Sequence, residues 1–265
     1  MRPPSHSGLG ASLAVQGRVI HALLLRELIT RFGRRNVGVL WLIAEPMLFT
    51  IVIMAFWTLS GMRRAGGMPV AAFAITGYSS VLMWRNTVSH CLHAIEGNSN
   101  LLYHRNVKLI DVFVARILLE LAGATASFIV LTLGFAALKL IELPADPLKV
   151  MAAWAMLAWF GASLAMLVGA ATAFGDIVAR LWSPLSYILF PLSGAAFMVS
   201  WLPPLTRQAV LILPMVHCVE LLREGYFGLS MHTYHDMGYV AVINLVLTFL
   251  ALAMLRLVAP RVEAR

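Results

Sequence analysis

Two histidines and a glutamate, His90, His93 and Glu96, recur at every third position of an expected helix. Imidazole and carboxylate groups in one cluster suit a metal such as zinc, which usually takes four protein ligands in a structural site. No other cluster of Cys or His in the sequence completes such a set. Histidines at a helix end that face water or a lipid headgroup explain the same spacing, so the sequence predicts no metal site.

Motifs for nucleotide binding or hydrolysis are absent from the sequence. The run Gly33–Gly38 is not followed by Lys and Ser or Thr, so it does not form a phosphate-binding loop. No metalloprotease or serine-hydrolase motif occurs either. Any ATP that drives this protein must be hydrolysed by another chain. The alternative, an intramembrane enzyme acting on lipid-linked sugars, has only the isolated His217 and Glu220 to support it.

Six apolar stretches, each at or near the length needed to cross a bilayer, set the fold class. They cover residues 37–60, 69–84, 112–138, 148–174, 182–202 and 237–258. A helix needs about 20 apolar residues to span the hydrocarbon core, and these runs lack the alternation of barrel strands. The sequence therefore predicts an all-α polytopic membrane protein with six transmembrane helices. Its transmembrane domain, 22–258, lies between tails at 1–21 and 259–265.

The orientation of these spans follows from the distribution of basic residues. If the N-terminus lies inside, the inner segments hold 14 of the 20 Lys and Arg residues and the outer segments hold 6. Basic residues accumulate in the cytoplasmic loops of membrane proteins, so both termini are predicted to be cytoplasmic. The charges flank the spans and form no soluble patch, so the net charge of +8 does not indicate nucleic-acid binding.

An amphipathic interface helix is predicted directly before the first span, at residues 22–32. Helical spacing gathers Arg26 and Arg31 on one face, which Arg34 joins. Most of the leucines fall on the opposite face, with Leu23 as the exception. Such a helix can lie at the inner membrane surface as a plain anchor. Alternatively, its basic face meets an anionic substrate or a cytoplasmic partner.

The longest polar loop on the inner side, residues 98–111, has two interpretations. Its leucines and basic residues have the spacing of a short surface helix with a mixed apolar and basic face. These residues are Leu101, Leu102, Arg105 and Lys108. The loop is either an ordinary connector or a docking element for another protein.

Charged side chains within the spans are candidates for a transport path. Glu45 and Pro46 lie in the first span, where a carboxylate costs about 2.5–3.5 kcal/mol and normally faces protein or water. Pro46 also permits a kink, so the pair is either structural or part of the path. Arg85 closes the second span and can snorkel to the inner surface.

Aromatic residues in the first and fifth spans extend this candidate path. They include Phe49, Phe56, Trp57, Tyr187 and Phe190. Aromatic faces stack well on sugar rings. Trp and Tyr also form belts at membrane interfaces, which is the competing explanation.

The segment 205–228 is too apolar for a solvated loop and too broken for a span. Pro214 divides it, and His217, Glu220 and Arg223 add polar groups. Two short helices that re-enter the outer leaflet and pack against protein satisfy this pattern. The three polar residues then form an outer gate, with Arg223 close to an acidic group or to the transported molecule.

The order and spacing of several short runs resemble one known family. These runs are Leu25–Gly33 with Leu40-Trp41 and Glu45-Pro46, Asn100–Asp111 with Ala115-Arg116, Pro191–Gly194 with Trp201–Pro203, and Pro214–His217 with Glu220–Gly225. The chain resembles the membrane subunits of type-2 ATP-binding-cassette exporters, specifically those that export capsular polysaccharide in Gram-negative bacteria. One departure is Leu213, where relatives often carry Asn before the proline.

The resemblance implies a homodimer in the inner membrane, with two separate ATPase subunits that bind ATP and Mg²⁺, so that this chain holds no cofactor of its own. It implies a coupling helix within 98–110 that enters a cleft of the ATPase, with candidate residues Asn100, Leu101, Leu102, Tyr103, Arg105 and Lys108. The implied substrate is an acidic, lipid-linked polysaccharide, passed on to a periplasmic export protein.

Two other transporter classes remain open at this stage. A type-2 exporter of O-antigen, teichoic acid, lipid or drug has nearly the same expected topology. An ion-coupled secondary transporter often shows paired repeats and broken helices at the midplane, and the sequence has no such repeat.

Overall fold

The computed structural model describes residues 9–32, 37–62, 64–98, 107–228 and 232–263, and these residues are almost entirely helical. The long helices are α1 (Leu9–Phe32), α2 (Val37–Leu59), α3 (Val70–Cys91), α5 (Leu109–Ala137), α6 (Pro147–Ala171), α7 (Ile177–Leu192) and α10 (Met237–Glu263). Shorter helices are α8 (Pro204–Val210), α9 (Pro214–Phe227) and the 3-10 turns η1 (Glu96–Asn98), η2 (Thr172–Phe174) and η3 (Val199–Trp201). A small hairpin joins strands β1 (Arg64–Ala65) and β2 (Met68–Pro69).

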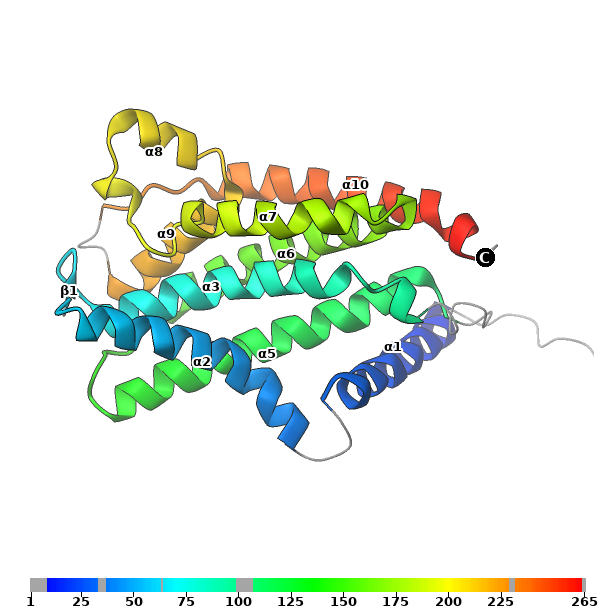
Figure 1. The fold of residues 1–265 in the computed structure, drawn as a ribbon, viewed down its shortest axis with the longest axis horizontal. Coiled ribbons are helices and arrows are strands. Elements are labelled where there is room, and N and C mark those ends of the chain that lie inside the picture. The colour runs from blue at the N-terminus through cyan, green and yellow to red at the C-terminus, as the bar shows by residue number, and fades with distance from the viewer. Residues whose placement is uncertain (1–8, 33–36, 63, 99–106, 229–231, 264–265) are drawn as a thin grey trace, which may run out of the picture.

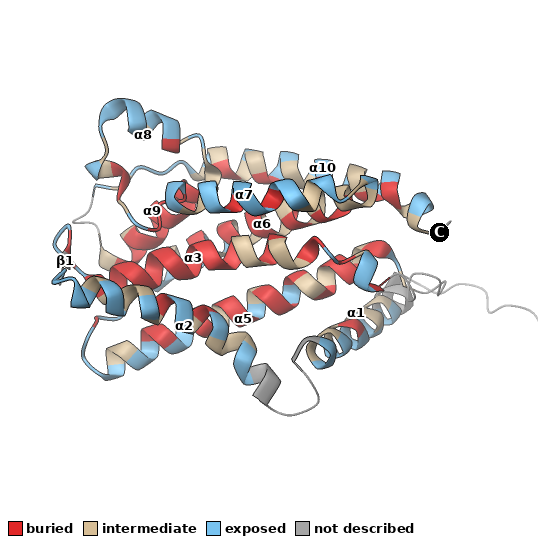
Figure 2. Cartoon of the chain, in the orientation of Figure 1, coloured by how far each residue is buried: buried red, intermediate tan, exposed pale blue. Residues whose placement is uncertain are grey.

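Helix α3 forms the centre of the bundle. Figure 1 shows α2, α3, α5, α6, α7 and α10 running along the long axis, with α8 and α9 at one end and α1 at the other. Most residues of α3 are buried, as the red ribbon in Figure 2 shows. The buried hydroxyls of Thr76 and Thr87 donate to carbonyls of the same helix, Thr76 to Ala72 at 2.9 Å and Thr87 to Met83 at 2.6 Å. The interior therefore accepts these polar side chains at little cost.

Two glycines of α6 allow it to approach α3 closely. A Cβ added at Gly161 would lie 3.1 Å from Cα of Trp84. A Cβ at Gly169 would lie 2.7 Å from the carbonyl oxygen of Cys91 and 2.5 Å from the ring of Phe113. Small residues permit such close helix packing within membranes.

By length and composition, four helices of the described residues can cross a membrane: α2, α5, α6 with η2, and α10. The count rises to five if α8 and α9, which are bent by 105° relative to each other, make one broken span. The bounds of these four helices lie close to those of four of the six predicted stretches. The predicted stretch 69–84 corresponds to α3, which continues to Cys91, and neighbouring helices cover its polar last turns.

The predicted fifth span, 182–202, is wrong at both ends. Helix α7 begins at Ile177 and ends at Leu192. Beyond it, Gly194 adopts a φ of +84°, a conformation that L-residues rarely take and that terminates helices. The chain then turns through η3 into α8.

Helix α1 also differs from the sequence prediction. It begins at Leu9, inside the stretch 1–21 that was predicted to be a tail. Leu23, the residue that did not fit the predicted apolar face, is buried, whereas Leu25 and Ile29 are exposed. The helix turns Leu23 and Glu27 toward α5, because the carboxylate of Glu27 pairs with Arg116 of that helix at 2.9 Å.

Substitution of Gly169 by Ala should destabilise the protein by about 1–3 kcal/mol, the usual cost of overpacking. The new methyl group would collide with the Cys91 carbonyl, which cannot move without disturbing the end of α3. Thermal unfolding of the purified protein in detergent measures the effect. Gly134→Ala in α5 is the matched control, because a Cβ there meets nothing within 4 Å. Equal melting temperatures for the two variants would contradict the assigned α3–α6 packing.

Candidate functional site

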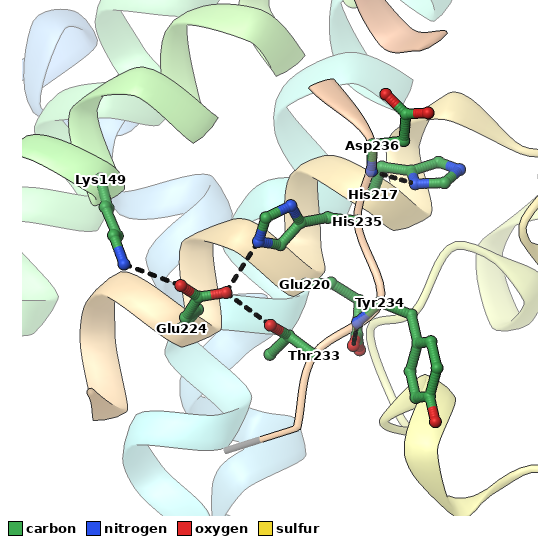
Figure 3. A network of polar contacts seen from close by, with 8 residues as sticks. All are labelled: Lys149, His217, Glu220, Glu224, Thr233, Tyr234, His235 and Asp236. Carbon is green, nitrogen blue, oxygen red and sulfur yellow. Dashed lines mark hydrogen bonds and ion pairs between the residues drawn. The ribbon is translucent and has the colours of Figure 1, made fainter. Parts of the chain in front are cut away.

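The carboxylate of Glu224 on α9 joins three elements (Figure 3). Its Oε1 lies 2.7 Å from the ammonium of Lys149 on α6. Its Oε2 accepts a hydrogen bond from the hydroxyl of Thr233 at 2.5 Å and lies 2.7 Å from Nε2 of His235. The side chain of Glu224 is only 14% exposed, and these partners compensate its charge.

His217, two turns earlier on α9, holds the next residues of the same segment (Figure 3). The backbone N–H of Asp236 donates to its Nδ1 at 3.0 Å. Its Nε2 lies 2.8 Å from the carbonyl oxygen of Leu211 and must therefore carry the proton. This pair of bonds requires the neutral imidazole, because protonation of Nδ1 would remove the acceptor.

Glu220 lies between them on the same face of α9 and also binds backbone groups. Its Oε2 accepts a hydrogen bond from the N–H of Tyr234 at 3.1 Å, and its Oε1 accepts one from the N–H of Val199 in η3 at 3.1 Å. His217, Glu220 and Glu224 thus hold residues 233–236, the segment that leads into α10. We call this arrangement the outer clasp.

Arg223 is fully buried and binds the chain just after α7. Its guanidinium donates to the carbonyl oxygens of Gly194 at 2.8 Å, Phe197 at 2.6 Å and Ala195 at 2.7 Å. It also lies 3.8 Å from the centre of the Phe73 ring. The sequence predicted that Arg223 lies close to an acidic group or to the transported molecule. The carboxylate of Glu220 is near enough to attract the guanidinium electrostatically, while the direct contacts of Arg223 are to carbonyl oxygens and an aromatic ring inside the protein.

The outer-gate residues are therefore interior residues of this chain. The exposed fractions of His217, Glu220 and Arg223 are 6%, 1% and 0%. None of the three presents its polar group on the surface of the structure. Their contacts stabilise the arrangement of α7, α9 and α10 at the end of the bundle that carries α8.

Several aromatic side chains predicted for the path meet around Tyr78 of α3. Its ring centre lies 6.0 Å from that of Phe49, 5.6 Å from that of Trp57 and 5.8 Å from that of Phe190. Phe49 and Phe190 also contact each other edge to face at 5.9 Å. These rings come from α2, α3 and α7, so the three helices share one aromatic cluster.

The cluster extends in both directions to form a continuous row. Toward the end that carries α8, Trp57 contacts Phe73 at 6.0 Å, and Phe73 stacks on Trp201 at 5.5 Å. Toward the other end, the guanidinium of Arg85 lies 5.7 Å from the Phe190 ring and 4.9 Å from the Tyr187 ring. We call this row, from Tyr187 to Trp201, the aromatic row. Phe56 is 64% exposed and lies outside it.

At the end of the bundle near α1, ionisable side chains of different helices contact each other. Arg116 and Glu120 lie one turn apart on α5, but each has a partner on another helix. In the structure, Arg116 contacts Glu27 of α1 and donates to the carbonyl of His90 at 2.8 Å. Nδ1 of His90 lies 2.9 Å from Glu120, and that of His93 lies 3.6 Å from Glu96.

Glu45 lines a cavity of about 20 Å³ beside His90 and Glu120, which is room for about one water molecule. Among the described residues, no three His, Cys, Asp or Glu side chains converge on a point where a metal could bind. The histidines predicted as possible ligands are directed to two different carboxylates.

Other predicted residues are only partly covered by the structure. Arg26 is exposed and donates to the side-chain oxygen of Asn98 at 2.6 Å. Lys108 is exposed and directly precedes α5, where its N–H donates to Asp111 at 3.0 Å. The side chain of Arg31, all of Arg34, and the coupling candidates Asn100, Leu101, Leu102, Tyr103 and Arg105 lie outside the described residues.

Comparison with known proteins identifies the family. The ABC-2 type transporter family matches residues 18–227, which is most of the chain. The chain belongs to the ABC-2 type transporter family. It is 42% identical over 252 residues to the capsule polysaccharide export inner-membrane protein CtrC of Neisseria meningitidis serogroup B, and the match covers 95% of each chain.

Two further relatives show the same full-length similarity. The capsule polysaccharide export inner-membrane protein BexB of Haemophilus influenzae is 40% identical over 92% of each chain. The polysialic acid transport protein KpsM of Escherichia coli is 29% identical over 91% of this chain and 94% of its own.

Sequence reasoning missed several residues that organise this ABC-2 transporter. Tyr78 and Phe73 join the aromatic row, but they lie in a helix whose composition suggested only a buried span. Lys149 and residues 233–236 complete the outer clasp. The three-and-four spacing of His217, Glu220 and Glu224 was a usable signal, since it places three acceptors on one helix face.

Replacement of Glu224 by Gln should weaken the outer clasp by about 1–2 kcal/mol, because the amide keeps the shape of the side chain and loses its charge. The partial exposure of Lys149 keeps the effect moderate. Amide hydrogen exchange of residues 232–236 should become faster in the variant. A double-mutant cycle with Lys149→Met should give a coupling energy of about 1 kcal/mol.

Glu142→Gln is the matched control for this experiment, because Glu142 is exposed at the same end of the molecule. Exchange in the control should remain at the wild-type rate. Unchanged exchange in Glu224→Gln would show that the clasp does not hold the segment before α10.

Proposed function

We propose that this chain is the transmembrane subunit of an ATP-driven exporter that moves lipid-linked, acidic capsular polysaccharide across the inner membrane of a Gram-negative bacterium. The full-length similarity to CtrC and BexB supports the substrate class and the membrane. The observation that carries the proposal within this chain is the aromatic row.

The aromatic row is suited to a sugar polymer. Ring faces attract sugar rings through dispersion and apolar contact and do not require one fixed orientation. Tyr187 is 67% exposed and Phe49 is 37% exposed, so both offer ring surface to a bound molecule. Several weak contacts in sequence allow a polymer to advance without being trapped at one site.

The topology that we propose has six spans, with α3 and α7 in addition to the four long apolar helices. Helix α3 is less apolar than the others because protein, not lipid, surrounds it. Helix α7 is apolar but short. With both termini in the cytoplasm, α1 is the interface helix, and the bent pair of α8 and α9 re-enters from the periplasmic side.

The partners that we propose follow from what this chain lacks. Its sequence has no phosphate-binding loop, so a separate cytoplasmic ATPase binds ATP and Mg²⁺. A second copy of the chain is supported by large apolar side chains on α2 and α7 that the single chain leaves exposed, among them Val52 and Ile188. A periplasmic export protein receives the polymer at the end formed by α8 and α9.

The ATPase should bind through residues 98–110. Truncation of Leu102 to Ala, combined with Arg105→Glu, should abolish export and substrate-stimulated ATP hydrolysis while membrane insertion stays normal. The physical reason is the loss of an apolar contact and the reversal of a charge at the contact surface. Capsule export and ATP hydrolysis of the purified complex measure the effect.

The control for this experiment carries the same two changes at the other end of the molecule, Leu140→Ala with Lys139→Glu, where both side chains are exposed. Its ATP hydrolysis should match that of the wild type. Normal complex assembly and export by the Leu102–Arg105 variant would refute the coupling assignment.

The aromatic row should be needed as rings and not only as volume. Phe49→Leu should reduce export severalfold at constant membrane abundance, because a stacking contact contributes about 1 kcal/mol. Phe49→Tyr should retain export, since the ring remains. Phe249→Leu in α10 is the matched control, because Phe249 is exposed and lies outside the row. Equal export by Phe49→Leu and Phe249→Leu would remove the row from the path.

A further inference from the structure

The short hairpin β1–β2 lies at the end of the bundle that carries α8 (Figure 1). Its strands pair Ala65 with Met68, which leaves Gly66 and Gly67 as the two-residue turn. The φ values of these glycines are +57° and +91°. Two consecutive residues with positive φ make the tight turn whose twist suits a β-hairpin, and glycine adopts this conformation readily. The sequence of the turn therefore determines the shape of the hairpin.

The turn of the hairpin lies against the indole ring of Trp201 in η3. A Cβ added at Gly66 would lie 2.2 Å from Cζ2 of that ring, closer than two such atoms can approach. A Cβ added at Gly67 would meet nothing within 4 Å. Only glycine at position 66 permits this contact, and the neighbouring position of the turn faces open space.

The underside of the hairpin covers the end of the aromatic row. Ala65 and Met68 are 8% and 5% exposed and belong to one hydrophobic cluster with Phe73. Trp57 packs against the same cluster. Phe73 stacks on Trp201, which contacts the turn itself. The last three rings of the row therefore lie beneath the hairpin or against it.

The contacts that keep the hairpin in place are weak. A two-stranded hairpin is only marginally stable by itself, and one of its two buried side chains is an alanine. Among the described residues, no hydrogen bond or ion pair joins 65–68 to η3. By contrast, Arg223 holds the chain after α7 with three hydrogen bonds to carbonyl oxygens. The hairpin can thus separate from Trp201 while the helices stay folded.

We propose that residues 64–69 form a lid over the outer end of the aromatic row, closed in this structure and lifted from Trp201 when the polymer leaves. The inference rests on the proposed function and adds an element that moves in each transport cycle. A polymer that follows the rings reaches Trp57 and Phe73 under the lid. It cannot pass Trp201 there while the turn of the hairpin lies on that ring.

Thiol labelling of the full-length chain in spheroplasts tests whether Trp201 holds the lid. Met68→Cys places a thiol beneath the hairpin, where a membrane-impermeant maleimide added from outside reacts slowly while the lid is closed. Adding Gly66→Ala should raise the labelling rate severalfold, because the new methyl group collides with the indole. Gly67→Ala is the matched control, since it carries a similar positive-φ strain without the collision.

Labelling also reports whether the lid opens during transport. Cys91 and Cys218 are 0% exposed, so the background from native thiols is low. In cells that export capsule, labelling of the Met68→Cys variant should slow severalfold when ATP is depleted, because the lid opens only as polymer leaves.

Cross-linking tests whether opening is required. Gly67→Cys on the lid and Ser200→Cys in η3 are joined by a short, reducible thiol cross-linker. Export should fall to background when the link forms and should recover when a reductant cleaves it. Recovery in the same protein shows that the link, and not the two substitutions, stopped export.

The opposite results separate the lid from the proposed function. Equal labelling rates in the Gly66→Ala and Gly67→Ala variants would show that the contact with Trp201 does not keep the hairpin closed. Normal export by the fully cross-linked chain would show that the hairpin does not need to move. Either result refutes the lid and leaves the proposed function standing. Failure of the wild-type chain to support capsule export would refute the function itself.

Discussion

The outer half of the molecule depends on one buried arginine. Where α7 ends, the carbonyls of residues 194, 195 and 197 face the interior, and Arg223 donates to all three. An unpaired backbone carbonyl in such a place costs free energy comparable to a lost hydrogen bond. Because the arginine belongs to α9 and rests on Phe73 of α3, this single side chain fixes three helices relative to each other.

The same constraint explains why the polar residues of α9 do not form an open gate. Each of them satisfies a backbone group, or a charge, of a segment that has no secondary structure of its own. Glu220 binds N–H groups both before α8 and before α10, so it joins the two ends of the α8–α9 pair. The polar groups of α9 thus stabilise the structure, and the proposed function assigns contact with the substrate to the aromatic rings.

Sequence reasoning predicted the elements that face lipid and was less accurate for those that face protein. Helices α2, α5, α6 and α10 each contain an apolar stretch long enough to cross a membrane, and their bounds were close to those expected. The last turns of α3 carry Asn86, Ser89 and His90 and lie beyond the predicted span, which ended at residue 84. They pack against Arg116 and Glu120 of α5, and such cover cannot be read from composition.

The residues of the candidate site were likewise only partly predictable from the sequence. Aromatic residues in α2 and α7 were recognisable from their number and placement. The role of Tyr78 depends on the distance between helices, which the close glycine contacts of α6 help to set. The carbonyl partners of Arg223 can be identified only when the end of α7 at Leu192 is known, because a backbone carbonyl leaves no pattern in the sequence.

Helix α7 has a mechanical property that follows from its two ends. Gly194, at the outer end, is held by Arg223, whereas Gly175, just before the other end, has a φ of +152° and open space around it. Along its length α7 packs chiefly against α3. Any rotation of this helix therefore pivots about the outer end, with the largest displacement beside Arg180. A small change in that angle would alter the separation of α3 and α7 beside Arg180 while the end at Gly194 stays in place.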